Sequence, residues 1–139
     1  MFSTIRLLEH VHGHIALLSA GLVLHPAVLV RQPKRRSITF LLAPIFLTLT
    51  SLLGAYIYGD YRVEIRQPLF LDSPAYGWMF ERKEHLAYFA TLLSWVGYFS
   101  PPDEEHPGRS VRALAFRTSA IIVWIVVVIG TAVAVKKSF

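Results

Sequence analysis

Apolar residues occur along this chain in four long blocks rather than in amphipathic stripes. The blocks cover about residues 9–30, 37–59, 82–99 and 112–136. A helix that spans a bilayer needs about 20 mostly apolar residues, and the third block approaches that length only with the polar turn Glu81–His85. The pattern predicts an all-α fold, a four-transmembrane-helix up-down bundle in which residues 1–139 form a single transmembrane domain.

The polar connections between the blocks predict an orientation. Connection 31–36 carries four basic side chains, so the positive-inside rule makes it cytoplasmic. Both termini then lie outside, and we expect an integral membrane protein of a bacterial inner membrane. Prolines punctuate the outer connection, and we expect Pro68–Phe80 to lie along the membrane surface as a loop or short re-entrant turn. Pro26 is expected to kink or end the first helix.

Composition supports this class and excludes others. The chain is 54% hydrophobic, which is too apolar for an ordinary soluble domain. Cysteine is absent, so the chain has no disulfides, no thiolate ligands and no site for covalent haem attachment. A net charge of +5 fits basic loops on a membrane protein better than nucleic-acid binding, which we do not expect. No nucleophile elbow, P-loop, zincin or dinucleotide motif occurs.

Histidines at the start of two apolar blocks are the candidate chemistry. His10, His12 and His14 open the first block, and His85 opens the third. Ionisable groups at membrane depth are rare and are functional candidates by default. At about 100° per residue, His10 and His14 share a helix face and His12 points elsewhere. A compact site for zinc made by all three histidines is therefore disfavoured, since zinc also prefers four ligands.

In an up-down bundle the first and third helices run parallel, so His14 and His85 are expected at similar depth across the core. Two imidazoles suit the axial positions of haem iron, with His10 as the alternate ligand. Arg82 and Lys83 would then meet the haem propionates. The predicted cofactor is haem b, and quinone is a more speculative second ligand. His25 has no matching histidine on the third helix, so we expect one haem at most.

Three short segments carry a family resemblance. They are His12-Gly-His14-Ile-Ala-Leu-Leu, Leu53-Gly-Ala-Tyr-Ile-Tyr-Gly-Asp60-Tyr and Arg82-Lys-Glu-His85-Leu-Ala. With them the layout resembles a bacterial family of small four-helix membrane proteins that have histidines opening helices 1 and 3. In architecture it is also similar to the membrane subunits of b-type cytochromes. The resemblance covers most of the chain and implies a haem-binding or redox-associated membrane protein, although the second histidine pair of two-haem cytochromes is missing.

Two functions are therefore expected. The first is a membrane b-type cytochrome or haem-binding subunit for electron transport in a respiratory chain. The second is a non-catalytic accessory subunit of a larger respiratory or photosynthetic complex, favoured by the small size and by the almost wholly apolar fourth block. The expected partners are membrane lipid, together with other membrane subunits or a redox partner protein. A transporter is disfavoured, because inverted repeats and broken helices are not evident.

Overall fold

The computed structural model describes the backbone of residues 2–32 and 37–137, and the side chains of residues 7–32, 37–63 and 66–135. All regular secondary structure in the described chain is helical and none is strand, which confirms the all-α prediction; residues 100–110 form a loop. The elements are α1 (Phe2–Leu29), α2 (Thr39–Tyr61), the π-helical segment η1 (Arg62–Arg66), α3 (Gln67–Asp72), α4 (Pro74–Phe99) and α5 (Val111–Lys137).

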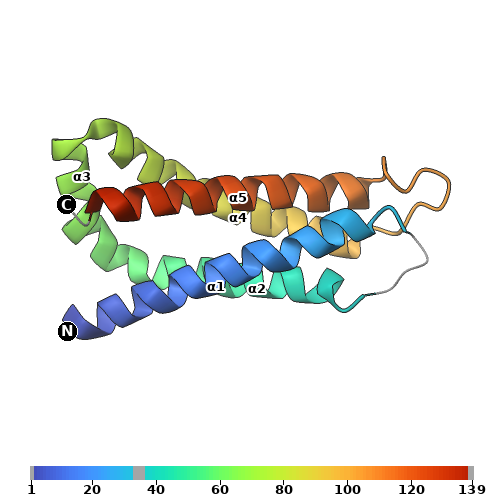
Figure 1. Ribbon diagram of the computed structural model, residues 1–139, viewed down its shortest axis with the longest axis horizontal. Helices are drawn as coiled ribbons and strands as arrows, with labels where there is room; N and C mark the ends of the chain where they lie inside the picture. The colour runs from blue at the N-terminus through green and yellow to red at the C-terminus, as the bar shows by residue number, and fades with distance from the viewer. Residues whose placement is uncertain (1, 33–36, 138–139) are drawn as a thin grey trace.

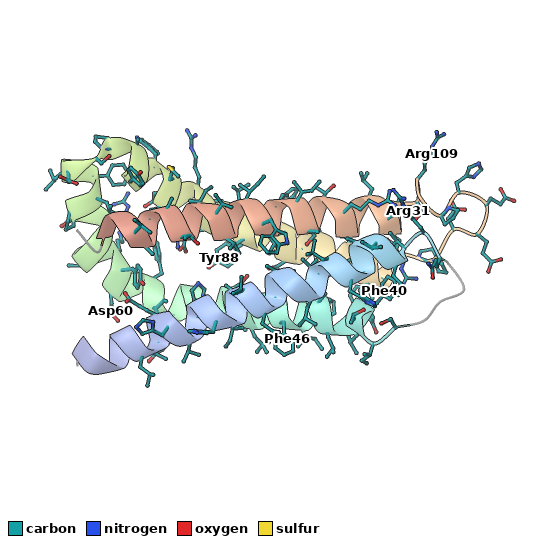
Figure 2. The ribbon with its side chains drawn as sticks, viewed as in Figure 1. Arg31, Phe40, Phe46, Asp60, Tyr88 and Arg109 are labelled. Atoms are coloured by element: carbon teal, nitrogen blue, oxygen red, sulfur yellow. The ribbon has the colours of Figure 1, made fainter. Side chains whose placement is uncertain are left out.

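The four long helices lie side by side, and α3 caps one end of them (Figure 1). Helix α1 packs against α2 and α5, and α4 packs against the same two helices. The helices therefore form a ring in which α1 and α4 occupy diagonal corners. Both chain termini lie at the end that α3 caps, here called the terminal end (Figure 1). Asp60 lies toward that end, whereas Arg31 and Arg109 lie at the opposite, loop end (Figure 2).

Three of the helices contain segments that are long and apolar enough to cross a membrane. They are Leu7–Leu29, Thr39–Tyr61 and Val111–Val135. These three segments indicate an integral membrane protein in contact with lipid. Helix α4 is similarly long, but four consecutive charged residues, 81–84, interrupt its apolar sequence.

Small residues and hydroxyl groups join the helices. Gly97 of α4 lies so close to the Phe116 ring of α5 that a Cβ on the glycine would be 2.7 Å from it. Hydroxyl groups bridge three sides of the ring, in the pairs Ser19–Thr50 at 2.9 Å, Ser51–Thr91 at 2.9 Å and Ser119 to the Ala90 carbonyl at 2.7 Å. Close approach of small residues and interhelical hydrogen bonds are the usual means of helix association where lipid is as apolar as the core.

The helix boundaries differ from the sequence-based prediction at two places. Helix α1 continues through Pro26 to Leu29, so the expectation that this proline ends the helix is wrong. Residues 68–80 are not a loop, because they form most of α3 and the start of α4. Pro74 occupies the first turn of α4, where its missing N–H removes no helical hydrogen bond. Helix α4 thus begins well before the predicted residue 82.

Candidate functional site

The two faces of α1 separate its histidines. Its buried positions include Ser19, Ala20, Val23 and Ala27, which lie on one side of the helix. At about 100° per residue, His14 lies opposite the centre of this buried face, and His10 and His25 lie close to His14 in angle. All three of these histidines are exposed. The outward stripe of α1 therefore carries the imidazoles that the sequence analysis assigned to the core.

His85 likewise lies on the exposed side of its helix, α4. The buried face of α4 contains Phe80, Ala90, Thr91 and Ser94, and His85 is exposed on the opposite side. Since α1 and α4 occupy diagonal corners of the ring, His14 and His85 point outward from opposite corners. The structure does not bring these two imidazoles together. A haem ligated by both of them inside one chain does not fit this arrangement.

The hydrogen bonds of His14 and His85 are nevertheless compatible with binding a metal or cofactor on the outer surface of the bundle. His14 Nδ1 lies 2.7 Å from the His10 carbonyl oxygen, and His85 Nδ1 lies 3.0 Å from that of Glu81. A carbonyl only accepts, so each Nδ1 carries a proton, and in the neutral imidazole Nε2 is then the nitrogen with the free lone pair. Histidines that bind metals commonly donate their other ring N–H to a backbone carbonyl in this way.

The two cations proposed for haem propionates are placed differently. Arg82 is exposed on α4. Lys83 is turned into the bundle, where its Nζ lies 4.8 Å from the centre of the Phe80 ring and 3.8 Å from the Glu84 carboxylate. Of the predicted pair, only Arg82 therefore lies on the exposed surface.

The inward-facing histidine is His12, which the helical spacing separated from the expected haem ligands His10 and His14. Its imidazole packs against Gly54 of α2, where a Cβ would lie 3.1 Å from the imidazole Cε1. Within the described residues its Nδ1 is buried without a hydrogen-bond partner. His12 shares a helix face with Ala16, Ser19 and Val23, at spacings of 4, 7 and 11 residues. That stripe of small residues was the signal that marks the core face.

Polar and aromatic side chains close the terminal end of the bundle. Glu81 of α4 forms an ion pair with Arg66 and accepts a hydrogen bond of 3.3 Å from the Tyr58 hydroxyl. The Phe80 ring stacks with Tyr58 and Tyr61, at centroid distances of 6.4 and 5.9 Å. In the part of the chain that the structure describes, no three His, Asp or Glu side chains gather into a metal site. This end therefore has the character of a structural closure.

The outward stripe of α1 surrounds a shallow hollow of about 480 Å³. It is lined by His14, Leu17, Leu18, Gly21, Leu22 and His25. No atom lies within 4 Å of the position that a Cβ on Gly21 would take, so the surface above this glycine is open. We call this surface the α1 hollow. It combines an apolar surface with two imidazoles, within the apolar segment Leu7–Leu29.

Comparison with known proteins gives no match: no family model, no curated protein and no solved structure matches the chain.

Proposed function

We propose that this chain is a small accessory subunit that binds another membrane protein through the α1 hollow. In this proposal all four long helices cross the membrane, giving the four-transmembrane up-down bundle. Helix α4 is included because it packs between α2 and α5 and runs beside them, with its charged segment toward the terminal end. The basic connection 31–36 then lies in the cytoplasm and the termini lie outside.

The depth of His14 is the observation that carries this proposal. The apolar segment Leu7–Leu29 is centred on Leu18, and His14 is four residues away, or about 6 Å along the axis. The hydrocarbon core is about 30 Å thick, so this exposed imidazole lies well inside it. Ionisable side chains at such depth almost always face protein or a watery cavity rather than lipid. A partner that covers the α1 hollow satisfies this requirement.

A photo-crosslink tests the docking surface. The chain has no cysteine, so Gly21→Cys introduces its only thiol, which can be labelled with a maleimide carrying a photoreactive benzophenone. In native membranes we expect this variant to give a discrete protein adduct after illumination, and we expect His14→Ala in the same background to weaken it.

Leu52→Cys is the matched control, because Leu52 is 62% exposed at a comparable depth on α2. The benzophenone at this position should react with lipid and give no protein adduct. Equal adducts from both positions, or none from Gly21→Cys, would count against the α1 hollow. A solitary monomer in mild detergent would argue in the same direction.

The second candidate function is a haem-binding subunit for electron transfer, and the orientation of the His14 and His85 rings favours it. Both residues are exposed, and in each ring Nδ1 bonds to the helix's own backbone, which leaves Nε2 for a ligand from outside. Haem would supply one-electron redox chemistry, and either His14 or His85 would be the residue of this chain that holds it, with another subunit supplying the rest of the site. A haem site of this kind agrees with the accessory-subunit proposal.

An optical spectrum tests the haem candidate. Protein purified after expression with added haem should show a Soret band that shifts and sharpens on reduction with dithionite. Replacing His14 by alanine, or His85 by alanine, should remove or shift the band. His12→Ala is the control, because His12 faces the core and should leave the band unchanged. Colourless wild-type protein, isolated together with its partner, would exclude this candidate while leaving the accessory role intact.

A further inference from the structure

A guanidinium group near the start of α5 has no ion-pair partner among the described residues. Arg112 is the second residue of α5, and its Cζ lies 4.1 Å from the centre of the Phe40 ring. Its Nε is buried and has no hydrogen-bond partner among the described residues. The two ion pairs found in the described part, Arg66–Glu81 and Lys83–Glu84, involve neither Arg112 nor the loop end. The connection 33–36 contains no acidic residue.

A second guanidinium at the loop end, that of Arg117, has hydrogen-bond partners for only some of its nitrogens. Arg117 donates from Nη1 to the Gly108 carbonyl at 2.8 Å and from Nε to the Ala27 carbonyl at 3.4 Å. Its Nη2 is buried and unpartnered within the described chain. These contacts are to neutral carbonyl groups, so they do not cancel the charge. Both side chains are only partly buried, so an anion from outside the chain can reach the guanidinium of Arg112 and supply the missing negative charge.

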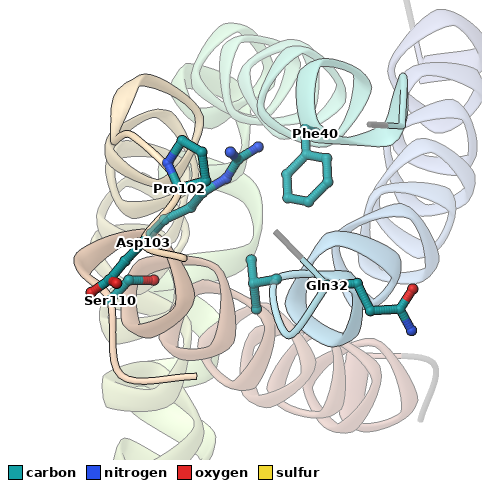
Figure 3. A pocket seen from close by; sticks show the side chains of 7 residues that line it. Gln32, Phe40, Pro102, Asp103 and Ser110 are labelled. Carbon is teal, nitrogen blue, oxygen red and sulfur yellow. The ribbon is translucent and has the colours of Figure 1, made fainter. Parts of the chain in front are cut away.

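A small hollow of about 10 Å³, with room for about one water molecule, lies beside Arg112. Figure 3 shows its lining side chains, among them Phe40, Gln32, Pro102, Asp103 and Ser110. Ser110 precedes α5 and caps it, because its Oγ accepts the Ala113 N–H at 3.2 Å. The start of this long helix adds partial positive charge to that of Arg112. We call this surface the loop-end hollow.

Asp103 also lines the loop-end hollow, but its carboxylate accepts hydrogen bonds from the backbone of its own loop. Asp103 Oδ1 accepts the backbone N–H of Glu105 at 3.0 Å and that of His106 at 2.8 Å. It forms no ion pair with Arg112. The positive charge of Arg112 is therefore still available to a ligand.

The depth of Arg112 selects the class of ligand. Arg112 is the second residue of the apolar segment Val111–Val135, which places its side chain at the boundary between membrane and water. Phospholipid phosphates lie at this level, and exposed Arg31 and Arg109 add positive charge at the same end of the bundle (Figure 2). We propose that the phosphate of an anionic phospholipid binds at the opening of the loop-end hollow, with Arg112 as its charged contact. Guanidinium groups bind phosphate with paired hydrogen bonds, and basic pockets between transmembrane helices bind anionic headgroups.

Native mass spectrometry of the full-length protein in mild detergent tests this site. Titration with phosphatidylglycerol and with phosphatidylcholine should show binding of the anionic lipid that is about tenfold tighter, or more. Arg112→Gln should remove most of this preference. Arg109→Gln is the matched control, because Arg109 is exposed and lies three residues before Arg112, so the variant removes the same charge outside the site. It should change the affinity for phosphatidylglycerol about twofold or less.

Two further measurements separate the alternatives. Asp103→Asn keeps an acceptor oxygen for the loop and removes a negative charge, so it should tighten binding of phosphatidylglycerol. If it weakens that binding instead, Asp103 is an internal counter-ion and the proposal is overturned. Inorganic phosphate at millimolar concentration should compete poorly with the lipid. Full displacement by phosphate, or equal loss in the Arg109 and Arg112 variants, would equally overturn the lipid site.

Discussion

Gly97→Val should destabilise the bundle by about 2–3 kcal/mol, as expected for overpacking of a well-filled core. Gly97 is buried where α4 meets α5, and a Cβ there would lie 2.7 Å from the Phe116 ring. The ring has nowhere to move, because Phe116 is fully buried and its edge packs on Phe40 at a centroid distance of 5.4 Å. The larger side chain must therefore push the two helices apart.

Unfolding in detergent micelles with increasing dodecyl sulfate, followed by circular dichroism, measures this loss. Gly130→Val is the control, because it makes the same substitution within α5 at a position where a Cβ meets nothing within 4 Å. It should change the free energy of unfolding by less than about 1 kcal/mol. An equal loss in both variants would mean that valine destabilises these helices wherever it is placed, and contact between α4 and α5 would not explain the effect.

The helical class could be predicted because the bilayer leaves few alternatives. Inside lipid every backbone N–H and C=O must be satisfied within the protein, so long apolar blocks become helices. The predicted blocks 37–59 and 112–136 correspond closely to α2 and α5. The predicted start of block 82–99 is less accurate, because α4 begins at Pro74 and includes a segment rich in aromatic and charged residues.

The inward and outward faces of α1 could not be told apart by hydrophobicity. Lipid is as apolar as the core, so Leu17 and Leu18 on the outside resemble Val23 on the inside. Histidine spacing grouped His10 with His14, but it gave no information on which side that pair would face. The distribution of small residues carries that information, since they collect where helices touch, and on this criterion His12 is the inward residue.

The prediction for the aromatic segment 68–80, which lies in α3 and the start of α4, is wrong for a different reason. Prolines at 68 and 74 were interpreted as loop residues, yet proline is well accommodated in the first turn of a helix. Both lie near the start of a helix here, in α3 and α4. Tertiary contacts complete the ordering, since the Phe70 ring packs edge-on against Trp78 at 5.6 Å between centroids. Such contacts between neighbouring short segments are not visible in a hydropathy pattern.

Phe116→Ala is expected to have the largest effect, a loss of about 3–5 kcal/mol in the free energy of unfolding. The ring is 0% exposed and its removal leaves a cavity between α5, Phe40 of α2 and Gly97 of α4. Leu114→Ala is the control, because Leu114 is 66% exposed and its side chain faces outward. The same dodecyl sulfate titration should show a change of less than about 1 kcal/mol for that variant.

The double variant Gly97→Val with Phe116→Ala tests whether the two residues act through one contact. Valine at position 97 projects into the space that the ring vacates, so the combined loss should be smaller than the sum of the single losses by at least about 1 kcal/mol. A purely additive result would mean that the α4–α5 spacing is set by other contacts between these helices, among them the hydrogen bond from Ser119 to the Ala90 carbonyl. Partial rescue would instead assign the close approach of α4 and α5 to the fit between Gly97 and the Phe116 ring.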